Sequence, residues 1–189
     1  MSKKIGMFVD SSNFYYACAQ KYFKRKLDYK AYYEYVKELG SIESCFVYGV
    51  QVGTEAKKFI ERVVAMGYTP KYRAPMSMDG DMRYRGNWKI GITVDIMTQF
   101  QDLDIVVIGS SEYGYDDLIR FLTANGKQVI IMAFGIPYTF KEIDNCVCIE
   151  IPESMLEKRP VREKQPVVEG QPDAKSFNEK ATTDTPTIT

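Results

Sequence analysis

Short apolar runs alternate with longer amphipathic stretches over residues 1–152. Each run is nearly continuous, as expected for a strand buried on both faces of a parallel sheet. The runs predict strands over residues 5–9, 44–52, 68–73, 105–109 and 128–134. The stretches between them carry apolar residues at helical spacing, and they predict helices over 14–24, 28–40, 54–66, 88–100 and 115–125. This alternation predicts an α/β fold: a single doubly wound, mostly parallel sheet with helices on both faces.

A change of composition divides the chain into two parts. Residues 1–152 hold the predicted elements and are long enough for one domain with a real core. Residues 153–189 contain recurring prolines among charged and small residues, and few large apolar ones. Such a composition does not bury enough apolar surface to fold alone. We therefore predict a disordered polar tail, which is a candidate binding segment for a protein partner.

Charge and histidine content narrow the chemistry. The chain has 25 basic and 25 acidic residues, so nucleic acid binding would require a local basic patch. It has no histidine, which excludes imidazole general bases, catalytic triads and most zinc sites. Carboxylates remain as the abundant acid–base and metal-binding groups.

The four cysteines show no CxxC spacing, and we predict buried, reduced thiols. Cys146 and Cys148 alternate as a strand would, but two thiols alone are weak support for a metal or redox site. No stretch approaches the roughly 20 apolar residues of a membrane helix, and no signal peptide pattern begins the chain. We expect a cytoplasmic protein.

Acidic and amide side chains follow two of the predicted strands. Asp10 and Asn13 come at the end of the first strand, and Glu112 follows the strand over 105–109. Ligands of open α/β sheets bind at the carboxyl ends of strands, although Asp10 would also suit a helix N-cap, as would the three residues after it. Asp95 stands among apolar neighbours on a predicted helix, which is costly unless the carboxylate is paired, bound to metal or exposed.

Three sequence blocks carry a resemblance to a known family. They are Val-Asp-Ser-Ser-Asn at residues 9–13, Arg-Gly-Asn-Trp-Lys-Ile-Gly-Ile-Thr-Val-Asp at 85–95, and Ile-Val-Val-Ile-Gly-Ser-Ser-Glu-Tyr-Gly-Tyr at 105–115. The combination resembles the NYN domain of the PIN-like nuclease superfamily, particularly its LabA-like branch, over roughly residues 4–151.

The resemblance implies a metal-dependent ribonuclease that hydrolyses phosphodiester bonds. Asp10, Asp95 and Glu112 would bind one or two Mg²⁺ or Mn²⁺ ions, hard cations that prefer carboxylate oxygen and activate water without histidine. Asn13 would complete the catalytic set by orienting Asp10 or a metal-bound water. RNA, through its phosphates, would contact a set of hydroxyl-bearing and basic residues: Ser11, Ser12, Arg83, Arg85, Lys89, Ser110 and Ser111.

The third block departs from the family pattern. Glu112 replaces the first aspartate of the motif, and Gly114 replaces the second. One carboxylate is lengthened and one is lost, so we expect low activity. The alternative is a catalytically impaired module that binds RNA or protein. A homodimer is also a candidate oligomeric state. A nucleotide-binding domain is disfavoured, because no glycine-rich phosphate fingerprint follows the first strand.

Overall fold

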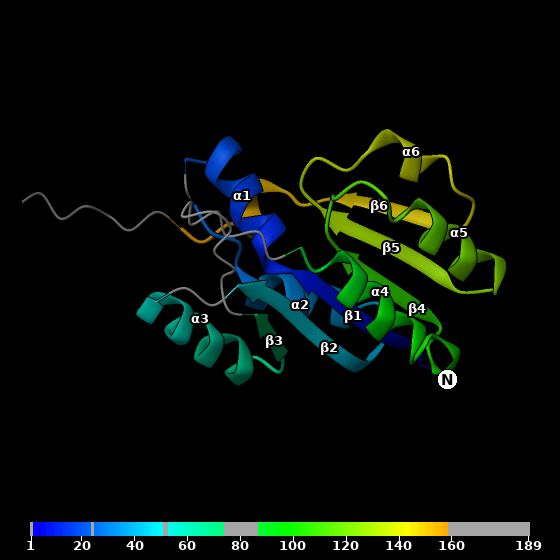
Figure 1. Cartoon of the computed structure of the whole chain (residues 1–189), viewed down its shortest axis with the longest axis horizontal. Coiled ribbons are helices and arrows are strands. Elements are labelled where there is room, and N and C mark those ends of the chain that lie inside the picture. The colour runs from blue at the N-terminus through cyan, green and yellow to red at the C-terminus, as the bar shows by residue number, and fades with distance from the viewer. Residues whose placement is uncertain (1, 24, 51–52, 74–86, 159–189) are drawn as a thin grey trace, which may run out of the picture. The chain divides into compact units, whose positions relative to one another are not determined.

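The computed structural model describes residues 2–23, 25–50, 53–73 and 87–158. Its centre is a six-stranded sheet in the order β3-β2-β1-β4-β5-β6, with every neighbouring pair parallel (Figure 1). The strands are β1 (Lys4–Asp10), β2 (Ser41–Val50), β3 (Thr69–Arg73), β4 (Ile105–Gly109), β5 (Gln128–Ala133) and β6 (Cys146–Glu150). The helices are α1 (Ser11–Lys21), α2 (Tyr29–Lys37), α3 (Gly53–Ala65), α4 (Lys89–Met97), α5 (Asp116–Ala124) and α6 (Tyr138–Lys141), with two 3-10 turns, Phe100–Asp102 and Glu153–Met155. The predicted α/β fold is confirmed.

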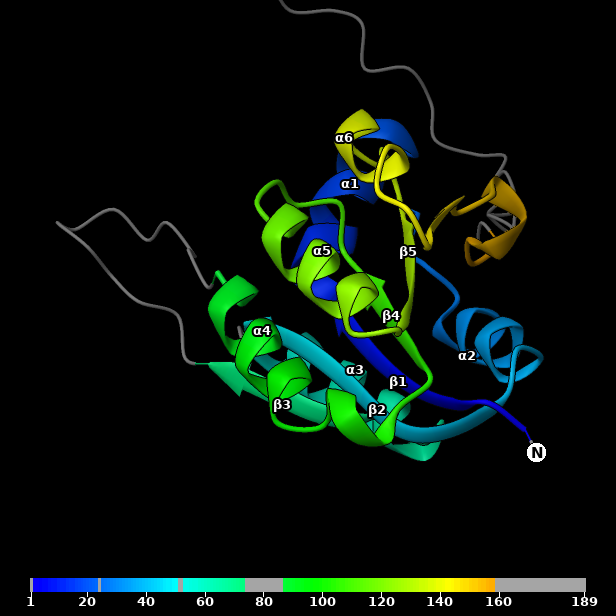
Figure 2. The ribbon, with the colours of Figure 1, turned by 90° about the vertical axis from the view of Figure 1, so that its right-hand side faces the viewer.

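The strand order places a switch point between β1 and β4. The chain runs outward from β1 through β2 to β3, then returns and runs outward the other way from β4 to β6. Right-handed crossovers therefore put α1, α2 and α3 on one face of the sheet and α4, α5 and α6 on the other. Figure 2 shows α4 and α5 in front of the strands and α3 behind them. Ligands of such sheets bind beside the carboxyl ends of the strands at the switch point.

The core lies around the middle strands. Residues 5–10 of β1 and all of β4 are buried, which explains their continuous apolar runs. Edge strands β3 and β6 are only partly covered. Cys146 and Cys148 on β6 are accordingly half-buried, whereas Cys18 and Cys45 are buried as predicted, and all four thiols are free.

Two local features differ from the sequence expectations. α1 begins at Ser11, because Asp10 rather than one of the following polar residues caps it. β6 extends the sheet beyond the five predicted strands, and the short α6 precedes it. The Cys-Val-Cys-Ile run of β6 is as long as that of β4, so the sequence does carry a strand signal that the prediction left out, whereas the four residues of α6 are too few to show helical spacing.

The described chain continues past the last strand. Leu156 is buried and pairs with Leu27, and the Glu157 amide donates to the Lys26 carbonyl at 2.8 Å. The tail predicted to be disordered began at residue 153, so the ordered residues 153–158 differ from that expectation, because Leu156 packs into the core. Residues 159–189 lie outside the described residues, as do Arg83 and Arg85. Within the described ranges, no helix has the length and apolar character needed to cross a membrane.

Candidate active site

Asp10 ends the central strand β1 and is 4% exposed. Its Oδ1 accepts hydrogen bonds from the Ser12 and Asn13 amides, both at 3.0 Å. These bonds cap α1, so the side chain has a structural role whatever its chemistry. Its Oδ2 accepts no hydrogen bond from any described residue.

The pKa of Asp10 is raised to about 6. Burial is the main cause, the amides of Asn13 and Ser12 oppose it, and the charge of Glu112 adds to it. Asp10 makes no ion pair with a described residue. The carboxylate is therefore ionised at neutral pH at a cost in folding free energy, as expected at a functional site.

Glu112 lies in the loop after β4 and faces the same cleft as Asp10. Its Oε1 accepts a hydrogen bond from Asn87 Nδ2 at 2.8 Å and lies 3.4 Å from Lys89 Nζ. Its backbone amide donates to the Oγ of Ser110, a wholly buried residue, at 3.3 Å. Asn87 thus fixes this carboxylate. The sequence analysis did not include Asn87 among the site residues, although it belongs to the second sequence block, at residues 85–95.

Asn13 joins α1 to the loop that follows β4. Its Oδ1 accepts hydrogen bonds from the amide and hydroxyl of Ser111, at 3.1 and 3.3 Å. The amide nitrogen Nδ2 has no hydrogen-bond partner among the described residues. The predicted binding residue Ser111 therefore orients Asn13, leaving two N–H donors of that side chain for another group.

Asp95 does not line the cleft with Asp10 and Glu112, and its carboxylate has other partners. On α4, its Oδ1 pairs with Lys71 Nζ at 2.7 Å, and its Oδ2 accepts a hydrogen bond from the Tyr48 hydroxyl at 2.8 Å. In the part of the chain that the structure describes, no three histidine, cysteine or acidic side chains are grouped so as to hold a metal ion. The structure brings Asp10 and Glu112 to one cleft and gives Asp95 other partners.

Gly114, where the motif has its second aspartate, has φ +89°, a conformation that side-chain-bearing residues rarely adopt. A Cβ atom added there would lie 3.2 Å from Lys89 Nζ. The backbone of this loop thus suits glycine, and an ammonium group occupies the adjacent space.

Tyr115 is a second site residue that sequence analysis did not identify. It is wholly buried, and its hydroxyl makes no hydrogen bond of good geometry with a described residue, although the Ser110 side chain lies near enough to oppose the rise of its pKa. Burial raises the pKa of this hydroxyl, and the charges of Asp10 and Glu112 raise it further. The hydroxyl therefore lies within electrostatic reach of both carboxylates.

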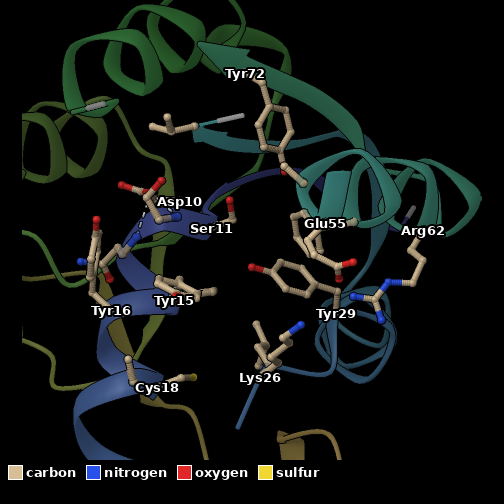
Figure 3. A pocket seen from close by; sticks show the side chains of 18 of the residues that line it. Asp10, Ser11, Tyr15, Tyr16, Cys18, Lys26, Tyr29, Glu55, Arg62 and Tyr72 are labelled. Carbon is tan, nitrogen blue, oxygen red and sulfur yellow. Dashed lines mark hydrogen bonds between the residues drawn. The ribbon is translucent and has the colours of Figure 1, made fainter. Parts of the chain in front are cut away.

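A cleft of about 1060 Å³ opens beside Asp10 and runs between α1 and α3 (Figure 3). Its lining includes five of the predicted site residues: Asp10, Ser11, Ser12, Asn13 and Glu112. Lys89, Ser110 and Ser111 contact these residues from outside the lining. The cleft also contains basic and aromatic residues that sequence analysis did not assign: Tyr15, Tyr16, Arg25, Lys26, Tyr29, Lys58, Phe59, Arg62 and Tyr72.

Comparisons with known proteins agree with the fold. The model of the NYN domain family matches residues 4–151. A crystal structure of a protein of unknown function from Vibrio parahaemolyticus is similar, with a TM-score of 0.73 and 22% identity over 82% of this chain and 97% of that one. No curated protein matches the chain.

Proposed function

We propose that this chain, which belongs to the NYN domain family, is a metal-dependent ribonuclease that hydrolyses phosphodiester bonds in the cleft beside Asp10. The family places it in the PIN-like nuclease superfamily, whose NYN members use divalent metals. The observation that carries the proposal is the pair of carboxylates, Asp10 and Glu112, lining one cleft at the carboxyl edge of the sheet. Membership of the LabA-like branch, the homodimer and a partner for the tail stay predictions.

The residues present fit a single divalent ion better than a cage made wholly of protein ligands. Mg²⁺ binds through one or two carboxylates and keeps several waters, and Asp10 and Glu112 supply that number. The Oδ2 of Asp10 has no hydrogen-bond partner among the described residues, whereas both oxygens of Asp95 already have partners. Bound there, Mg²⁺ or Mn²⁺ would polarise the phosphate and activate water.

The protein's own residues would hold the substrate and its charges. The amides of Ser12 and Asn13 fix one oxygen of Asp10 and leave the other free. Ser111 holds the Asn13 side chain so that its N–H donors are available to a phosphate oxygen or a water. Lys89 offsets the charge of Glu112, and the proposed phosphate contacts Arg83 and Arg85 lie outside the described residues.

The proposal is tested with labelled single-stranded and structured RNA in Mn²⁺, Mg²⁺ or EDTA. The wild-type protein is expected to cleave RNA slowly with metal and not in EDTA. Asp10→Asn should lose cleavage, because it removes ligand charge while keeping the shape of the side chain. Asp28→Asn is the matched control: Asp28 caps α2 through two amide bonds of 3.0 Å, as Asp10 caps α1, but does not line the cleft. Full activity in Asp10→Asn would overturn the assignment.

A second candidate is a module that binds RNA without cleaving it. The pairing of Asp95 with Lys71 and the backbone of Gly114 favour it, since two acids of the family pattern are then unavailable to a metal. Binding of RNA with no cleavage in either metal would select this alternative.

A further inference from the structure

The half of the cleft farthest from Asp10 has features that the proposed hydrolysis does not use. This half lies between α1 and α3 and includes Tyr15, Lys26, Tyr29, Phe59 and Arg62. In Figure 3, Asp10 and Ser11 lie at one end of the cavity and Lys26 and Arg62 at the other. We call it the α1–α3 half.

Tyr29 presents an unused hydroxyl in this half. The residue is 9% exposed, and its ring is held edge-on by Phe59 and Tyr68, with centroids 5.0 and 6.0 Å away. The hydroxyls of Tyr32 and Tyr68 donate to backbone carbonyls at 2.9 Å. The Tyr29 hydroxyl has no such partner among the described residues, and Figure 3 shows it pointing into the cavity. It is a fixed hydrogen-bonding group open to a ligand.

The charges of this half leave one cation available. Arg25 pairs with Glu153, Lys58 pairs with Glu55 at 3.1 Å, and Arg62 pairs with Glu157 at 3.4 Å. Lys26 is exposed and makes no ion pair with any described residue. Lys58 and, more weakly, Lys26 lower the pKa of Glu55, but the Lys26 ammonium is not held in an ion pair and is available to an anionic group entering here.

An exposed aromatic ring completes the surface. Tyr15 is 65% exposed on α1 and lines the cleft. Exposed rings beside a cation are the features that bind single-stranded nucleic acid, because every base has a face that stacks. A cleft of about 1060 Å³ is at the upper end of the roughly 300–1,000 Å³ of common ligand pockets, a size that accommodates a nucleotide.

We propose that the α1–α3 half is a nucleotide subsite, in which a base stacks on Tyr15 and bonds to the Tyr29 hydroxyl while its phosphate contacts Lys26. The inference rests on the proposed function for the position of the reacting phosphate. Its ligand is a nucleotide, either within a single-stranded RNA or as a free mononucleotide.

The test is binding of a fluorescent eight-nucleotide single-stranded RNA, measured by anisotropy in EDTA, so that it does not depend on cleavage. Tyr15→Ala and Lys26→Gln are each expected to weaken binding about tenfold, and Tyr29→Phe about threefold. Controls are Tyr138→Ala, an exposed tyrosine on α6, and Lys30→Gln, an exposed lysine on α2; neither lines the cleft. Both should bind within twofold of wild type, and circular dichroism checks the fold of each variant.

Competition with nucleoside monophosphates separates the two sources of ligand. Displacement at micromolar concentration assigns the subsite to free nucleotides, and binding of the oligonucleotide alone assigns it to a strand. Absence of binding to both probes, or equal binding by the three cleft variants and wild type, overturns the inference. RNA binding that depends on these residues without cleavage in any metal would defeat the proposed hydrolysis and leave the subsite standing.

Discussion

Two aspartates from the family pattern occupy opposite electrostatic settings. Asp10 is buried, has no cationic partner among the described residues, and lies near a second carboxylate, so its pKa is raised to about 6. Asp95 is half-buried and pairs with Lys71 and the Tyr48 hydroxyl. A carboxylate that is costly to ionise gains from a bound cation, whereas one with an internal cation does not. The difference indicates different roles for the two residues. Asp10 supplies a carboxylate to the cleft, whereas Asp95 attaches α4 to β2 and β3.

The largest expected effect is that of Asp10→Asn. Cleavage should fall at least 100-fold, while the free energy of unfolding at pH 7 without metal should rise by about 2–3 kcal/mol, because a shift of about two pKa units corresponds to roughly that energy. The sign follows from the raised pKa: the folded state favours the protonated carboxyl, so this contribution is present below pH 3.8 and is lost as pH rises through about 6.

Denaturant unfolding of the wild type and of Asp10→Asn at pH 4 and pH 7 measures this change in the free energy of unfolding. The stability difference between the variant and wild type should be larger at pH 7. Equal stability differences at the two pH values would mean that burial does not make the Asp10 carboxyl costly to ionise.

Asp95→Asn should have the opposite sign. It leaves Lys71 without its partner, and since the two side chains are 20% and 35% exposed, the loss should be about 1–2 kcal/mol, between the values of surface and buried pairs. Cleavage should change less than tenfold. Thermal melts of Asp95→Asn, Lys71→Met and the double variant measure the pair, and the double variant should recover part of the loss. A stabilised Asp95→Asn protein without nuclease activity would instead make Asp95 a metal ligand.

Local pattern predicted the fold well where burial was complete. The runs at residues 5–9 and 105–109 are apolar throughout because both faces of β1 and β4 are covered. β6 was missed although four of its five residues are apolar, because it is an edge strand that is only partly buried and no long amphipathic helix precedes it. In the cleft, strand ends located Asp10 and Glu112, since parallel strands bring their carboxyl ends to one edge.

The partner of Asp95 could not be predicted in the same way. Lys71 belongs to β3, whereas Asp95 belongs to α4, which lies between β3 and β4 in the sequence and starts 16 residues after β3 ends, at Lys89. Which charged side chains meet across such a crossover depends on register and helix rotation, which residue spacing does not encode. The same limit applies to Lys26 and Tyr29, which reach the cleft through the turn into α2.

Gly114 offers a smaller effect that tests whether the family pattern can be restored. Gly114→Ala should cost about 1 kcal/mol, because φ is +89°. Gly126→Ala is the control for the backbone cost alone, because its φ is +77° and an added Cβ meets nothing within 4 Å. Gly114→Asp should be the better tolerated change at residue 114, because its carboxylate would lie beside Lys89 Nζ.

Calorimetry of Mn²⁺ binding extends this test to the double variant Glu112→Asp, Gly114→Asp. We expect tighter binding of metal by a protein that is less stable without it. An unchanged affinity would show that this loop does not contribute to a metal site.

The smallest expected effect is that of Tyr115→Phe. A wholly buried hydroxyl without a partner costs free energy, because it has lost its bonds to water and gained none in the protein. Removing it should leave the stability of the metal-free protein unchanged or raise it by up to about 1 kcal/mol, measured by denaturant unfolding at pH 7. Tyr32→Phe is the matched control, since that equally buried hydroxyl donates to the Met132 carbonyl at 2.9 Å, and its loss should destabilise by about 1 kcal/mol. Destabilisation of both variants alike would mean that the Tyr115 hydroxyl is hydrogen-bonded in solution, either to the Ser110 side chain or to a water.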